Sequence, residues 1–321
     1  MEAHLRIHPP WTRWQKMAYR FFFIFLTLQV LTENFLGNLF GNTLFVWRLG
    51  EKVFVPPCLW LNGHLFHFKY IPQSWTTFSG ALHTIRDIVY LALACAGAVI
   101  WATLDRKAKD YHRQLVWFSK FLVAALSCII YAYGIMKVFA VQMGKPSPAT
   151  LRTAVGDLSP FELIWAVYGY GTPYQVFGGL MEVTGAVLIL FSRTRAVGLL
   201  IIASVMMNVI LLNYTFQIGV LVTSFYILLV TLFLLAPYMA SLVKLFFFRE
   251  KVSLLPVPGR PVRTARWLKI AGMFFIVVSF MLNTWFAYSV YNRRKHKPVP
   301  ECKLMQTPRT IIIFDDTSDS E

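Results

Sequence analysis

Long apolar runs separated by short polar connections are the main pattern in this chain. A helix needs about 20 mostly apolar residues to cross a bilayer, and seven segments meet this length with varying clarity. They are residues 17–36, 81–104, 115–141, 174–192, 195–213, 217–236 and 268–290. The pattern predicts an all-α protein, a multi-pass transmembrane helical bundle of about seven spans.

The composition agrees with this prediction. Hydrophobic residues make up 57% of the chain and charged residues 14%, and the mean hydropathy is +0.55. About a quarter of the residues of a soluble domain are charged, so the balance is that of an integral membrane protein. The four cysteines, Cys58, Cys95, Cys128 and Cys302, form neither a CxxC motif nor a metal-type cluster. We therefore expect no disulfide framework and no metal site.

The basic residues indicate topology. A net charge of +16 would suggest nucleic acid in a soluble protein, but here the basic residues lie between apolar runs, so we expect a lipid bilayer and no nucleic acid as partner. With a cytoplasmic N-terminus, sixteen Lys and Arg residues fall in inside connections and five in outside ones. The positive-inside rule favours that orientation. A basic run at residues 292–297 opposes it, so an even number of spans is the main alternative.

The connections divide the chain into five parts. These are residues 1–114 with two spans and a long outer loop, residues 115–247 with four spans, residues 248–267 as a basic Pro-rich cytoplasmic linker, residues 268–291 as the last span, and residues 292–321 as a polar tail. The tail contains one strand-like run, residues 311–314. Cys58 and Cys302 fall in predicted outer segments, so both should react with an impermeant thiol reagent from outside.

One carboxylate, Glu182, lies inside the fourth predicted span. A charged residue at a helix centre costs roughly 2.5–3.5 kcal/mol on insertion scales, so its surroundings must offset that cost. Its neighbours at helical spacing are small: Gly178, Gly179, Gly185 and Ala186. Small residues let helices approach closely in membranes. We therefore expect Glu182 to face other helices.

Other polar residues lie at the same predicted depth. On the second span, His83, Arg86, Asp87 and Tyr90 share one helix face. On the third, Gly134 precedes Lys137 on one face, and the rise per residue places Lys137 within reach of Glu182. Arg86, Asp87, Lys137 and Glu182 are expected to form a neutral set.

Two interpretations of this set stay open. Paired charges can hold three helices in register, as polar residues in membranes often do. Alternatively, they line a polar pocket for a quinone-like or other small amphipathic molecule. Asn208 and Asn213 on the fifth span are either interhelical hydrogen-bond donors or part of such a pocket.

The remaining candidate residues and motifs give weaker indications of a functional site. His64 and His67 have a spacing that could face one metal ion, but no further ligand lies close in sequence, so we favour an interfacial pair. Histidines are not placed on facing spans, which disfavours haem. No GxGxxG, Walker A, GxSxG or HExxH motif occurs, so enzyme chemistry of the soluble type has no support.

The runs "YAYGIMKVFAVQ", "GDLSPFELIW" and "YQVFGGLMEVTGAVLILFSRTRAVG" resemble the longer members of the DoxX-like bacterial membrane family, over roughly residues 60–240. The matching features are Gly134 with Lys137, Glu182 with Gly185, and the basic turn at residues 193–195. The resemblance implies a DoxX-type four-helix core within residues 115–247. The chain departs from the family at Gln217, where an acidic and then a basic residue are usual, and at residues 79–81.

The resemblance implies a protein of the bacterial inner membrane, and the positive-inside rule gives it a cytoplasmic N-terminus. Its function would be that of an accessory or binding subunit in quinone-linked redox metabolism, at most one subunit of a membrane oxidoreductase. A quinone is the one cofactor suggested, and a redox or assembly protein the partner. The alternative is a non-catalytic assembly, transport or scaffold component.

Overall fold

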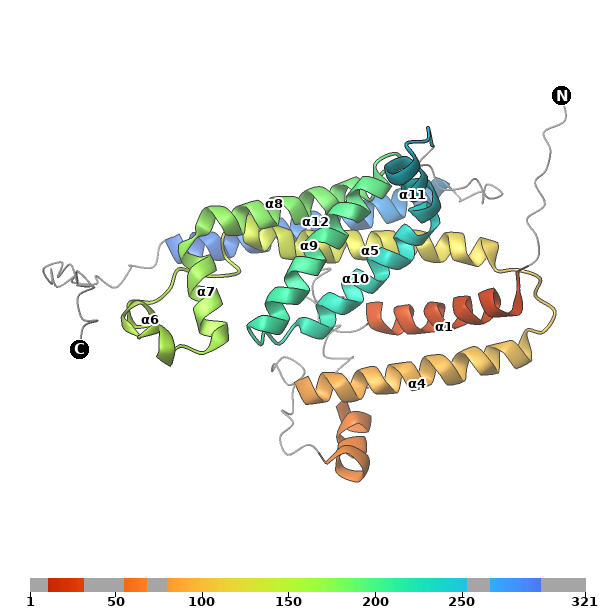
Figure 1. Ribbon diagram of the computed structural model, residues 1–321, viewed down its shortest axis with the longest axis horizontal. Coiled ribbons are helices and arrows are strands. Elements are labelled where there is room, and N and C mark those ends of the chain that lie inside the picture. Colours follow the sequence, from red (N-terminus) through yellow and green to blue (C-terminus); the bar gives the residue numbers. More distant parts are fainter. Residues whose placement is uncertain (1–10, 32–54, 68–79, 253–265, 296–321) are drawn as a thin grey trace, which may run out of the picture.

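The computed structural model describes residues 11–31, 55–67, 80–252 and 266–295, and most of them are helical (Figure 1). No strand occurs in these four ranges. Five helical stretches within them are long and apolar enough to cross a bilayer: Thr84–Leu104, His112–Val138, Arg195–Thr215, Leu221–Phe248 and Arg266–Lys295. The prediction of an all-α fold with the composition of a multi-pass membrane protein is confirmed.

Two further predicted spans form helices that are shorter or more polar. α1 (Arg13–Val30) begins at a capping box formed by Thr12 and Gln15. α8 (Thr172–Leu188) ends before the predicted residue 192, because side chains from the next turn satisfy its last carbonyls. The Thr194 hydroxyl donates to the Leu188 carbonyl at 2.8 Å, and Arg195 Nε donates to the Ile189 carbonyl at 2.8 Å.

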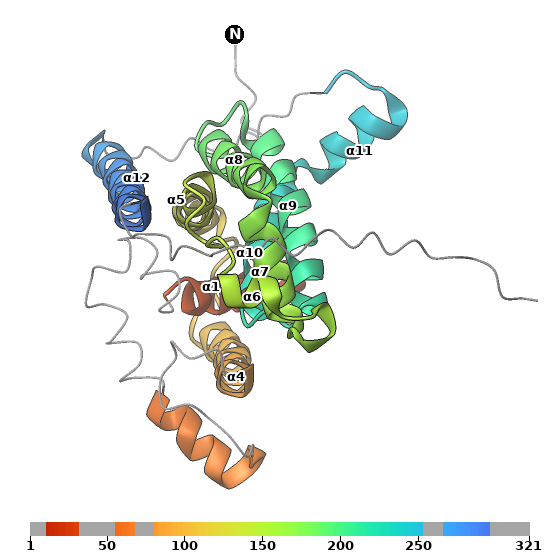
Figure 2. The same cartoon turned by 90° about the vertical axis from the view of Figure 1, so that its left-hand side faces the viewer.

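α5 (His112–Val138) is the central helix of the bundle. It packs against α8, α10 (Leu221–Leu235) and α12 (Arg266–Lys295), and α9 (Arg195–Thr215) packs against both α8 and α10. Figure 2 looks nearly along α5 and shows α12 on one side of it and α8 and α9 on the other. The four helices α5, α8, α9 and α10 therefore form a closed ring of contacts.

Glycines allow the closest helix contacts in this ring. A Cβ atom built on Gly179 of α8 would lie 2.6 Å from the Gly134 carbonyl of α5, and one built on Gly134 would lie 2.9 Å from the Gly179 carbonyl. On the other side of α8, a Cβ on Gly185 would lie 2.7 Å from the Ile202 side chain of α9. No real side chain fits at such distances, so glycine sets the spacing of α5, α8 and α9.

α1 packs against α4 (Gly80–Leu104) beside the ring. A polar network fixes the end of this pair next to the start of α5. Arg20 Nε donates to the Tyr111 hydroxyl at 2.9 Å and Arg20 Nη2 to the Asp105 carbonyl at 2.9 Å, and the Tyr111 hydroxyl donates to the Asp105 carboxylate. Arg20 is buried, and this set satisfies its Nε and Nη2 donors.

The connection between α5 and α8, expected to be a loop, contains three short helices: α6 (Pro148–Arg152), η2 (Val155–Asp157) and α7 (Pro160–Tyr170). α7 begins at a capping box in which Ser159 Oγ accepts from the Glu162 amide and Glu162 accepts from the Ser159 amide. The hydrogen bonds that the Ser159 hydroxyl and the Ser159 amide donate to the Glu162 carboxylate lower the pKa of Glu162.

α7 lies against the chain that leaves α5. A Cβ on Gly169 would lie 2.0 Å from the Gly144 carbonyl, so only glycine permits this contact. At the opposite end of the ring, α10 continues through η3 (Ala236–Tyr238) into α11 (Met239–Phe248), which projects from the bundle (Figure 2).

Residues 55–61 are helical and continue in the π-helical turn η1 (Asn62–Phe66). Cys58 packs there against Val55 and Ile85 and is only 1% exposed. The expectation that Cys58 reacts readily from outside is therefore wrong for the folded chain, because the thiol is buried. Cys302, the strand-like residues 311–314 and most of the predicted linker lie outside the described residues.

Candidate functional site

A buried ion pair joins α5 to α8. Lys137 lies in the last turn of α5, and its Nζ donates to Oε1 of Glu182. The Lys137 side chain is 13% exposed and that of Glu182 2%. The Glu182 Cβ lies against Gly134, at 2.9 Å from where a Cβ on that residue would be, so the glycine contact makes room for the pair.

The pair lies on the wall of a partly open cavity of about 350 Å³ lined by residues of α5, α7, α8, α9 and α10. Ligand pockets usually measure about 300–1,000 Å³. The aromatic side chains on its wall are Tyr133, Trp165, Tyr168, Tyr174 and Phe177. The neutral polar ones are Gln142, Gln175, Ser204, Asn208, Asn213, Thr223 and Ser224. The cavity therefore offers aromatic faces and one charged pair.

Two hydrogen-bond acceptors on this wall have no partner within the described part of the chain. They are Oε2 of Glu182 and Oε1 of Gln142, which lies in the connection after α5. Lys137 satisfies only the other carboxylate oxygen of Glu182. Leaving a buried acceptor unfilled costs about 1–3 kcal/mol, more for a charged group.

Gln175 fixes the connection that follows α5 at the edge of the cavity. Its Nε2 donates to the Met143 carbonyl at 3.0 Å, and its Oε1 accepts from the Met143 amide at 3.2 Å. Gln175 is 1% exposed, so it ties the connection after α5 firmly to the start of α8. Burial and the neighbouring Tyr174 raise the pKa of Tyr168 in α7, which keeps that hydroxyl neutral.

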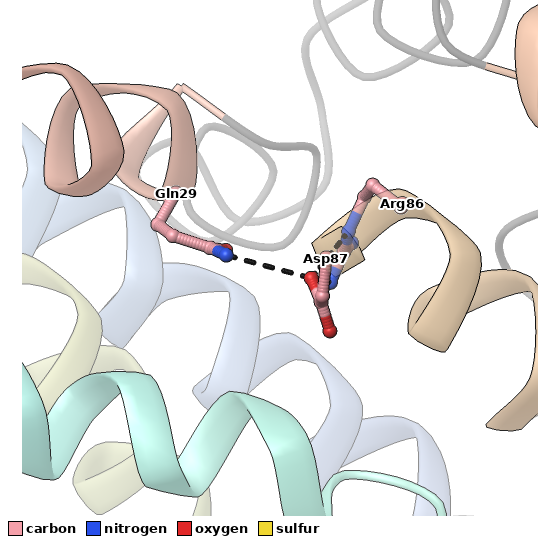
Figure 3. Close-up of polar contacts among 3 residues, drawn as sticks. All are labelled: Gln29, Arg86 and Asp87. Atoms are coloured by element: carbon pink, nitrogen blue, oxygen red, sulfur yellow. Dashed lines mark hydrogen bonds and ion pairs between the residues drawn. The ribbon is translucent and has the colours of Figure 1, made fainter. Parts of the chain in front are cut away.

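The other two predicted charges form a separate cluster between α1 and α4 (Figure 3). Arg86 Nε and Nη2 both donate to Oδ1 of Asp87 at 3.1 Å, and Gln29 Nε2 of α1 donates to the same oxygen at 3.4 Å. The Arg86 guanidinium also faces the ring of Tyr90 at 5.8 Å. The four charges thus form two pairs on different helices, not the single neutral set expected.

The remaining predicted residues have different positions. Asn208 of α9 lies on the cavity wall, whereas Asn213 donates to Ser224 Oγ of α10 at 2.7 Å, an interhelical hydrogen bond. Gly178, expected on the packing face with Gly179, has open space around it and lines the cavity. His83 belongs to the first turn of α4, but its side chain is not among those described.

The His64 ring stacks on Trp60, and its Nδ1 lies 2.8 Å from the Trp60 carbonyl. In the ranges that the structure describes, no group of three His, Cys, Asp or Glu residues could hold a metal ion. His64 therefore has a local partner on its own helical segment.

Sequence reasoning missed the part of the site that comes from the connection between α5 and α8. Gln142, Trp165 and Tyr168 were treated as residues of an outer loop, yet they line the cavity. The signal that could have revealed α7 is its start, "SPFE", which places a Ser at the N-cap, a Pro after it and a Glu three residues on.

No family model matches the chain. The chain is similar to an uncharacterized protein, YwoB, of Bacillus subtilis (strain 168), with 38% identity over 90 residues, which is 28% of this chain and 56% of that protein. The chain thus spans about 56% of the length of the curated relative it matches. No solved structure matches it. These comparisons show distant, partial homology to an uncharacterised protein and assign no family.

Proposed function

We propose that the chain is a multi-pass inner-membrane protein that binds a small amphipathic molecule in the cavity beside Lys137 and Glu182. The observation that carries the proposal is a buried ion pair with an unfilled carboxylate oxygen on the wall of a mostly apolar cavity. Ionisable groups within membrane helices are costly and usually mark a functional position. A pair that only joined two helices would need no cavity beside it.

The location of the cavity follows if α1 and α8 cross the bilayer together with the five candidate spans. The helices α1, α4, α5, α8, α9, α10 and α12 alternate in direction along the chain (Figure 1), as such a topology requires. The positive-inside rule then gives a cytoplasmic N-terminus. Under this topology, the end of α5 and the start of α8 lie in the outer half of the bilayer, together with the cavity.

The DoxX resemblance suggests a quinone-like molecule as ligand. Lys137 has further N–H groups to offer a ring carbonyl, and the aromatic side chains of α7 and α8 can stack on a ring. The residues that carry the resemblance, Gly134 with Lys137 and Glu182 with Gly185, lie at the α5–α8–α9 contacts. The function would be that of an accessory or binding subunit in quinone-linked redox metabolism.

Mass spectrometry of the gently extracted chain tests this function. We expect a co-purifying quinone-like lipid, or binding of added menaquinone or ubiquinone analogues. The double variant Lys137→Met/Glu182→Gln should lose that ligand, since it removes both charges without leaving one unpaired. Arg106→Met, at an exposed position between α4 and α5, is the matched control and should keep it. Equal ligand content in the parent chain, the double variant and Arg106→Met would contradict the proposed site.

A scaffold or assembly role is the second candidate, and the glycine contacts between α5 and α8 favour it. In that case the ion pair only strengthens a close helix interface. This candidate predicts a co-purifying partner protein and no bound small molecule. The same extraction therefore separates the two candidates.

A further inference from the structure

We infer that the cavity selects a neutral ring-bearing amphiphile with two hydroxyl donors over a molecule of the same shape that only accepts hydrogen bonds. This inference rests on the proposed function, because it concerns the same cavity. It goes further by naming the hydrogen-bonding character of the ligand, which the DoxX resemblance leaves open.

The unfilled groups on the wall carry the argument. Both Glu182 Oε2 and Gln142 Oε1 are acceptors, and both are buried. A buried acceptor gains a hydrogen bond only from a ligand that donates. A ligand with carbonyl or ether oxygens alone could accept from Lys137 but would leave both of these acceptors unfilled. Of a quinone-like molecule, the reduced hydroquinone form is therefore the one that the cavity favours.

The charge balance argues for a neutral ligand. Lys137 already neutralises Glu182 within the cavity wall. A cationic ligand would approach Lys137, and an anionic one would approach Glu182 and the Gln142 oxygen. Either charge would be buried among aromatic side chains with no counter-ion of its own, which is costly.

The shape of the wall argues for a ring. Aromatic side chains from three helices, α5, α7 and α8, line the cavity on the side of the ion pair. Aromatic rings prefer stacked or edge-to-face neighbours. The volume of about 350 Å³ suits one ring with a short alkyl chain better than a whole phospholipid.

The test compares two probes of nearly equal shape on the full chain in lipid nanodiscs. 4-Hexylresorcinol carries two hydroxyl groups, and its dimethyl ether carries none. Each hydrogen bond of this kind changes affinity by a factor of roughly 2–12. For two such bonds we therefore expect the resorcinol to bind roughly 4- to 140-fold more tightly by titration calorimetry.

Three variants locate the effect. Gln142→Met should weaken resorcinol binding by about fivefold and leave the ether unchanged, because it removes one acceptor at similar length. Gln114→Met makes the same exchange at an exposed position at the start of α5 and should change neither. Gly178→Leu should abolish binding of both probes, since its side chain would extend into the cavity.

The outcomes separate this inference from the proposed function. Equal affinities for the two probes, both lost in Gly178→Leu, would overturn the preference for donors while the cavity remained a binding site. Binding that Gly178→Leu does not affect, or no binding of either probe, would overturn both. The probe comparison needs no variant, so a misfolded Gln142→Met protein would not obscure it.

Discussion

Two buried ion pairs in the described residues differ in how many groups donate to the carboxylate and in whether a buried carboxylate oxygen is left without a donor. In the pair on α4, Asp87 Oδ1 accepts from Arg86 twice and from Gln29 of α1, and Arg86 also faces the Tyr90 ring. In the pair between α5 and α8, Glu182 uses one oxygen for Lys137 and leaves the other unfilled beside a cavity.

This difference separates two uses of charge in an apolar bundle. Neighbours along one helix form the first pair, and Gln29 on a second helix adds a further donor, which is the arrangement expected of polar groups that join helices. The second pair joins residues 45 positions apart and remains incomplete. An incomplete buried pair is costly unless something fills it, which is why the binding proposal concerns Glu182 and not Asp87.

Breaking the two pairs should give the largest contrast. Glu182→Ala leaves the Lys137 ammonium buried without a counter-ion, so we expect a loss of about 3–5 kcal/mol in the free energy of unfolding. Asp87→Asn should cost less, because Arg86 keeps the Tyr90 ring and a residual amide acceptor. SDS-induced unfolding of the purified proteins in mixed micelles, followed by circular dichroism, measures both.

The double variant Lys137→Met/Glu182→Gln is the control for that experiment. It should recover most of the stability lost in Glu182→Ala, because no unpaired charge is left. If Asp87→Asn were as destabilising as Glu182→Ala, the contrast between the two pairs would fail.

Two adjacent glycines of α8, Gly178 and Gly179, test how closely α5 and α8 approach each other beside the Lys137–Glu182 pair. Gly179→Ala would place a methyl group 2.6 Å from the Gly134 carbonyl and 2.7 Å from the Val138 amide nitrogen, so the helices must separate. We expect a loss of about 1–3 kcal/mol in the same unfolding assay. Gly178→Ala is the matched control, with open space around it, and should be neutral or stabilise by up to about 1 kcal/mol through helix propensity. Equal losses in the two variants would show that the close contact is absent.

Much of the helical framework could be predicted from sequence, because apolar runs of spanning length allow few other structures in a membrane. The small residues around Glu182 also indicated that it faces other helices, and the structure places Lys137 against it. Gly178 and Gly179 looked alike in sequence, yet one packs and the other lines the cavity. Which of two neighbouring small residues meets a helix depends on the rotation of α8, and spacing alone does not fix that rotation.

The rest of the site could not be predicted because it depends on packing between distant segments. The Gly144–Gly169 contact and the hydrogen bonds of Gln175 help to hold Gln142 and α7 at the cavity. The separation of four charges into two pairs likewise depends on where α1 and α4 lie relative to the ring. A rise per residue gives depth in a membrane but not lateral position.

Cys58, whose thiol is close enough to the Arg86–Asp87 pair to be affected by both charges, offers the mildest test. Burial raises the pKa of its thiol from 9.0 to about 11, while the Arg86 charge lowers it and the Asp87 charge raises it. Alkylation proceeds through the thiolate. In a chain with Cys58 as its sole cysteine, the alkylation rate should therefore rise about tenfold per pH unit up to roughly pH 10, where the rate for an ordinary thiol has already levelled off.

Asp87→Asn should increase the alkylation rate at pH 8 several-fold, since it removes the charge that raises the pKa of Cys58. The exposed control Asp157→Asn should not change the rate. A rate that levels off near pH 9 in the parent chain would place the thiol in solvent, away from the pair.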